Sequence, residues 1–174
     1  MPRYRHNEGV RYRLRELVNW INGSTLLGMA AAGVSRTRLT RGPNGLFIGH
    51  GYRLSVPPRR NRAFTLGNVV LCRYTNAELA NHPTLLVHEA RHATQYAWCL
   101  GVVMLPLYFL AAGWSWVRTG DYASRNVFER RAGLADGGYT EHPLRSVQRA
   151  RRLTQSRATR SGTTKDSGCT RPDR

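Results

Sequence analysis

The chain has 174 residues, enough for one domain with its own core, and a formal charge of +17 from 27 lysines and arginines against 10 acidic residues. The charge favours an acidic partner, such as nucleic acid, an anionic membrane or an acidic polypeptide, without choosing among them. Cys72, Cys99 and Cys169 lack paired spacing, which argues against a disulfide scaffold or a zinc knuckle and favours a reducing, cytoplasmic compartment.

Two helices are predicted at the start of the chain. Residues 1–23 predict one amphipathic helix with a basic first half, and the apolar run from Thr25 to Gly33 predicts a second helix packed against it. The alternative is a cleaved secretory signal, because a basic stretch precedes an apolar one. We disfavour a signal because the basic stretch is long and contains Glu8 and Glu16.

The apolar pattern then changes to short strands. Three segments are predicted as a hairpin and two further strands: residues 37–48, 52–56 and 63–71. Gly67 is the predicted site of a bulge in the last strand. A small, mostly antiparallel sheet is therefore expected. One exposed strand of it could pair with an extended peptide, and plain scaffolding is the alternative interpretation.

The segment Pro83–Leu100 predicts a helix that carries His88-Glu89-x-x-His92. Residues four apart lie on the same helix face, so His88 and His92 can bind one Zn²⁺ ion. Glu89 lies one step round the helix, where a general base for a zinc-bound water must stand. The alternative is an amphipathic helix in which the two histidines are stacked by accident.

Residues 97–117 contain no charged side chain and have tryptophans near both ends. Their length permits a membrane span. Gly101, Pro106 and Gly113 instead favour a bent, buried segment with a shallow membrane contact. A span would also carry the chain roughly 30 Å from His92, which nearly excludes a metal ligand at Glu129.

Residues 120–136 predict a loop followed by a short helix with Asn126 as its N-cap. Two histidines need a third protein ligand to make a catalytic zinc site. The candidates are Asp121, Glu129, Asp136, Glu141 and His142. We prefer Glu129, because its helix can pack against the first through Phe128, although a surface glutamate is the alternative. Asp136 could accept the free N–H of a zinc-bound imidazole.

These residues resemble a known family. His88-Glu89-x-x-His92 followed by Gln95 looks like the zincin-like metallopeptidase domains of many bacterial proteins of unknown function. The segment around Glu129 is similar to the downstream glutamate element of their Glu-ligand, or gluzincin, branch. The resemblance covers roughly residues 64–139.

The resemblance implies a zinc ion held by His88, His92 and Glu129, with Glu89 as the base for peptide-bond hydrolysis. The oxyanion needs a further donor, for which Tyr122, Tyr139 and His142 are the candidates. Two residues depart from the family pattern. Arg91 is charged where zincins usually have an uncharged residue, and Gly133 stands where many gluzincins have an acidic one.

We therefore expect an α+β fold, with one zincin-like domain over residues 1–144, a metal-site core at about 63–139 and a basic, disordered tail at 145–174. The expected function is that of a cytoplasmic or membrane-associated zinc metalloendopeptidase acting on a polypeptide. One alternative is a zincin-fold module that binds zinc without turnover. Another is an Arg-rich protein that binds nucleic acid or an anionic surface through Arg59–Arg62 and the tail.

Overall fold

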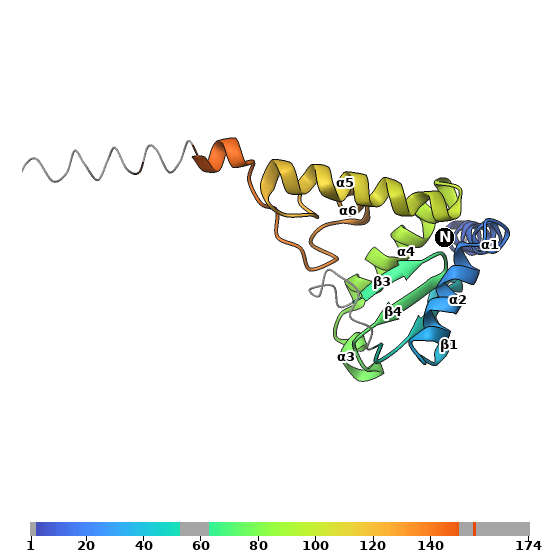
Figure 1. Cartoon of the computed structure of the whole chain (residues 1–174). Coiled ribbons are helices and arrows are strands. Elements are labelled where there is room, and N and C mark those ends of the chain that lie inside the picture. The colour runs from blue at the N-terminus through green and yellow to red at the C-terminus, as the bar shows by residue number, and fades with distance from the viewer. Residues whose placement is uncertain (1–2, 53–62, 150–154, 156–174) are drawn as a thin grey trace, which may run out of the picture.

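The computed structural model describes residues 3–52, 63–149 and 155. Helices α1 (Arg3–Ile21) and α2 (Ser24–Val34) come first, as the sequence predicted. The elements that follow are β1 (Leu39–Arg41), the 3-10 turn η1 (Pro43–Gly45), β2 (Phe47–Gly49), β3 (Ala63–Leu66), β4 (Val69–Cys72), α3 (Asn76–Ala80), α4 (Pro83–Trp98), the 3-10 turn η2 (Gly101–Val103), α5 (Met104–Thr119) and α6 (Val127–Ala132). The expected α+β class is confirmed (Figure 1).

Some predictions fall outside the described part of the chain. These are most of the predicted strand at 52–56 and the basic loop Arg59–Arg62. Of the predicted tail, residues 145–149 are helical, and the rest lies outside the described residues except for residue 155.

The described strands form one sheet in the order β1-β2-β4-β3. The pairings β1–β2 and β3–β4 are antiparallel, and β2–β4 is parallel, so the expected mostly antiparallel sheet is correct. The predicted single strand at 63–71 is wrong: Gly67 has φ +60° and, with Asn68, forms a two-residue turn between β3 and β4. A turn of this length needs a residue that tolerates positive φ. Among the described strands β3 pairs with β4 alone and is therefore an edge strand.

The sheet lies between two helices. On one face Val70 and Ile48 pack with Ala93 and other apolar residues of α4. On the other face Val69 and Leu71 pack with Ala32 of α2. Strand β4 is buried on both faces, as expected of a central strand covered on each side by a helix. Figure 1 shows α5 on the far side of α4 from the sheet, with α6 beside it.

Helix α4 and the η2–α5 segment meet at a bend of 113°. Leu100 and Gly101 there have φ of 56° and 76°, and a Cβ on Gly101 would lie 2.6 Å from Asn22 Cγ. Within the described ranges no helix is long and apolar enough alone to cross a bilayer, although this bent pair passes the same test together. The prediction of a bend within 97–117 is thus confirmed.

The prediction that residues 97–117 are buried is wrong for one side of α5. Leu110 is 71% exposed and Trp114 is 59% exposed. The reason is geometric: α5 packs through one face onto α6 and the site region, and no described element covers its other face.

Helix α2 approaches the sheet closely at Gly28, where a Cβ would lie 2.6 Å from Val69 Cβ. We expect Gly28→Ala to lower the free energy of unfolding by about 1–3 kcal/mol, because the close-packed helix and sheet must separate. Gly33→Ala is the matched control: nothing lies within 4 Å of its Cβ position, so a gain of up to about 1 kcal/mol is expected. Urea unfolding measures both, and equal effects would contradict the close packing.

Candidate metal centre

Helix α4 turns its two histidines and the intervening glutamate toward the interior. His88, Glu89 and His92 are 2%, 3% and 7% exposed. The helix takes this orientation because Leu85, Leu86 and Ala90 pack against the sheet core. The two imidazole rings lie edge to face with centroids 4.6 Å apart. The i, i+4 spacing therefore places the two side chains together, as the sequence predicted.

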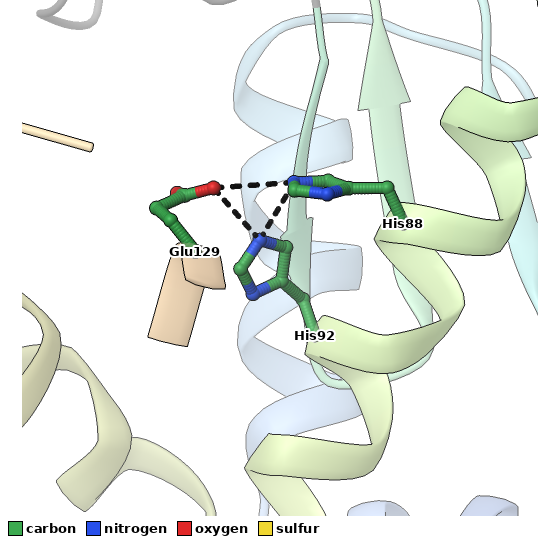
Figure 2. Close-up of side chains that lie close together, drawn as sticks. All are labelled: His88, His92 and Glu129. Atoms are coloured by element: carbon green, nitrogen blue, oxygen red, sulfur yellow. Dashed lines mark hydrogen bonds and ion pairs between the residues drawn. The ribbon is translucent and has the colours of Figure 1, made fainter. Parts of the chain in front are cut away.

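Helix α6 supplies the third group. Asn126 caps the helix by accepting a hydrogen bond from the Phe128 N–H at 3.0 Å, as predicted. The Gln95 side-chain amide donates to the Phe128 carbonyl at 2.9 Å and ties α6 to α4. Glu129, 2% exposed, then faces both histidines (Figure 2).

The ligand atoms of His88, His92 and Glu129 all lie within 4.8 Å of one another. The two Nε2 atoms are 3.0 Å apart, and Glu129 Oε2 lies 3.2 Å from His88 Nε2 and 3.6 Å from His92 Nε2. Figure 2 shows the three side chains converging from two helices. The structure thus brings together the three residues that the sequence singled out as ligands.

Hydrogen bonds fix which nitrogen of each imidazole faces the cluster. His88 Nδ1 lies 2.9 Å from the Gly133 carbonyl oxygen, and His92 Nδ1 lies 2.8 Å from Gln95 Oε1. These oxygens can only accept, so each Nδ1 must donate. In the neutral rings, both Nε2 atoms then carry lone pairs, which is the orientation in which histidine binds a metal.

The cluster fits a divalent cation. Three acceptor atoms this close repel one another unless a proton or a cation lies between them. Glu129 Oε2 is buried without a hydrogen-bond partner. In a tetrahedral site with ligand distances of about 2.0–2.1 Å, neighbouring ligand atoms lie roughly 3.3 Å apart. The observed separations of 3.0, 3.2 and 3.6 Å bracket that value.

The electrostatics of the cluster favour a charged carboxylate. Burial opposes ionisation of Glu129, but its closeness to His88 and His92, one of which can carry a proton on Nε2 when no metal is bound, lowers its pKa to about 2. Burial also opposes an imidazolium at His92, yet Glu129 raises the pKa of that ring. A proton and a metal ion therefore compete for the same nitrogen atom.

Tyr108 is a site residue that the sequence analysis missed. Its hydroxyl donates to Glu129 Oε1 at 2.5 Å, which leaves Oε2 for the histidines. Burial and the neighbouring Glu129 charge raise the pKa of Tyr108 well above its usual value, so it stays a donor. The sequence feature that could have identified Tyr108 is its hydroxyl group within the otherwise apolar run at 97–117.

Glu89 lies beside the three ligand groups and is not one of them. Thr65 of the edge strand β3 donates a hydrogen bond to Glu89 Oε2 at 2.6 Å. This contact, also missed from sequence, fixes one oxygen of the carboxylate. A positioned carboxylate beside a metal position can accept and return a proton.

Arg91 and Asp136 have roles that differ from those expected. Asp136 does not contact an imidazole, because its carboxylate pairs with Arg91 Nη1 at 2.6 Å. The predicted contact with a zinc-bound histidine is therefore wrong, and the Gly133 carbonyl takes that place at His88. Arg91 also donates to the Ala132 carbonyl at 2.7 Å. Together these contacts clamp the end of α6.

The clamp also explains the glycine at position 133. Gly133 has φ +90°, and a Cβ there would lie 2.6 Å from Arg91 Nη1 and 2.7 Å from Asp136 Oδ2. Arg91 and Gly133, the two residues that differ from the zincin pattern the chain resembles, thus belong to one local arrangement, in which Arg91 occupies the space that a side chain at 133 would need.

Two neighbouring cavities, of about 540 and 640 Å³, flank Glu89. The first contains the cluster, and both are lined by Ala63, Glu89, Tyr122 and Tyr139. The Tyr139 ring lies 5.9 Å from the His88 ring and from the Tyr122 ring. His142 lines only the second cavity and is exposed. Of the three candidate oxyanion donors, the two tyrosines therefore lie near the cluster.

Comparison with known proteins adds no relative: no family model, curated protein or solved structure matches the chain. Functional inference therefore depends on the geometry of the site.

We predict that the protein binds one divalent metal ion per chain, and that His92→Ala and Glu129→Ala each abolish binding because two ligands cannot complete the site. Elemental analysis after reconstitution with zinc measures the content. The matched controls are His82→Ala and Glu141→Ala, which change exposed residues of the same types outside the cluster. Equal metal content in ligand variants and controls would contradict the assignment.

Proposed function

We propose that the protein is a zinc-dependent metallopeptidase of the gluzincin type. One observation carries the proposal: His88, His92 and Glu129 converge on one buried point with Glu89 beside it. Two imidazoles and one carboxylate, with a fourth position left for water or substrate, are a donor set used by catalytic zinc sites.

When bound, zinc would lower the pKa of a water molecule and polarise a substrate carbonyl. Glu89 accepts a proton from the attacking water and passes it to the leaving amine nitrogen. Thr65 supports this role, because its hydrogen bond holds Glu89 Oε2 in place. Tyr122 or Tyr139 donates a hydrogen bond to the developing oxyanion from the wall that the two cavities share.

A polypeptide substrate agrees with the walls of the cluster cavity. Residues 63–66 of the edge strand β3 line it. An extended peptide can add to such an edge through main-chain hydrogen bonds, which would lead its backbone past Glu89. The overall charge of +17 favours an acidic peptide over a basic one.

We expect Glu89→Gln to keep its zinc and to lose about 10²–10⁴-fold in hydrolysis rate, because the amide cannot take a proton from water. The measurement uses the zinc-loaded protein and an internally quenched peptide library, with zinc content determined on the same samples. Glu141→Gln, in an exposed ion pair with Arg130, is the control and should match wild type.

Two outcomes would contradict the proposal. If zinc-loaded wild type cleaves no peptide in the library, the site is a binding centre and not a peptidase. If Glu89→Gln is as active as wild type, Glu89 is not the base.

A further inference from the structure

Helix α5 buries its uncharged polar residues and exposes most of its large apolar ones. Its inward face carries Tyr108, bonded to Glu129, and Ser115, whose hydroxyl donates to the Asp121 carbonyl at 2.6 Å. Its outward face carries Leu107, Leu110, Trp114 and Val117, which are 42–71% exposed. Within α5, no charged residue precedes Arg118. A helix in contact with water shows the opposite arrangement.

The exposed surface continues round the bend before α5. Trp98 and Leu100 are 82% and 76% exposed. We call Trp98, Leu100, Leu107, Leu110, Trp114 and Val117 the apolar face. An exposed apolar surface of this extent marks a site of contact with another protein or a membrane.

Helix α1 shows the same inversion where it reaches this bend. It buries Arg15 and Asn19, with Asn19 donating to the Ala93 carbonyl at 2.8 Å, and exposes Leu17 and Ile21. The residue that follows α1, Asn22, packs on Gly101. Helices α1 and α5 therefore both bury polar side chains and expose apolar ones, and α1 ends beside the bend that precedes α5.

A second copy of the chain and a membrane are the two obvious partners for the apolar face, and the net charge favours the membrane. A second copy would bring another +17 against the first, and the two copies would repel each other. An anionic bilayer would attract the chain. Exposed indole and aliphatic groups together with a basic protein are typical of helices that lie in the bilayer interface. Arg118, at the end of the face, is exposed and can reach lipid headgroups.

We propose that the apolar face docks this protein onto the surface of an anionic membrane. Helix α5 lies in the plane of the interface: its 16 residues rise about 24 Å, less than the roughly 30 Å of a bilayer core. Its contact with Glu129 through Tyr108 holds the helix on the protein.

The docking has a consequence that rests on the proposed function. Leu105, Phe109 and Ala112 of α5 line the cluster cavity, and Phe109 is also 64% exposed. One helix thus separates the metal centre from the bilayer. The substrate would then be a polypeptide held at the membrane surface.

Flotation with lipid vesicles tests the docking without any assay of activity. The full chain should float with vesicles of phosphatidylcholine and phosphatidylserine, and much less with phosphatidylcholine alone. The double variant Leu110→Glu/Trp114→Glu should lose at least about tenfold in binding, because two inserted side chains become charged. Val34→Glu is the matched control, since Val34 is 75% exposed on α2, and should bind like wild type.

Wild-type tryptophan fluorescence gives a second measurement that needs no variant. Emission should shift to the blue with the mixed vesicles, since Trp98 and Trp114 would leave water. Three results would overturn the proposal: no flotation with either vesicle; full binding by the double variant, which would mean adsorption by charge alone; or a stable dimer that Leu110→Glu dissociates. If the zinc-loaded wild-type protein floats with the mixed vesicles but cleaves no peptide, the proposed function is contradicted and the docking is not.

Discussion

The structure depends on a single buried point where two imidazole nitrogens and a carboxylate oxygen meet within 3.6 Å of one another. Buried acceptors at that distance are costly unless a cation or a proton is shared among them. The chain nevertheless directs its hydrogen bonds so that both Nε2 atoms face inward. The surrounding contacts therefore hold His88, His92 and Glu129 in an arrangement whose electrostatic energy is unfavourable until an ion or a proton lies between the three acceptor atoms.

Each neighbouring element holds one part of this constellation. Helix α4 carries the histidines, the Asn126 cap starts α6 beside them, and Gln95 connects the two helices. Strand β3 fixes Glu89 through Thr65, and α5 fixes Glu129 through Tyr108. The inner face of α5 thus contacts the metal site, and its outer face is available for the proposed contact with a membrane. The metal centre and the apolar face therefore lie on opposite sides of α5.

Local patterns were sufficient to predict the α+β class, the histidine pair and the position of Glu129, because helical spacing and an Asn cap act within a few residues. The same patterns could not predict contacts that depend on how α5 folds back. Tyr108 reaches Glu129 from 21 residues away in sequence, and no periodicity reports that. The position of Asp136 on its predicted helix face suggested a hydrogen bond with an imidazole. In the structure its carboxylate instead forms an ion pair with Arg91.

X-ray absorption spectroscopy at the zinc edge of the reconstituted protein tests directly whether His88, His92 and Glu129 bind the ion. If His88, His92 and Glu129 hold the ion, its first shell consists of nitrogen and oxygen atoms at about 2.0–2.1 Å, with the scattering pattern of two imidazoles. A shell containing sulfur at about 2.3 Å, or one of oxygen atoms alone, would contradict it. Either result would mean that His88, His92 and Glu129 meet for a reason other than holding the ion.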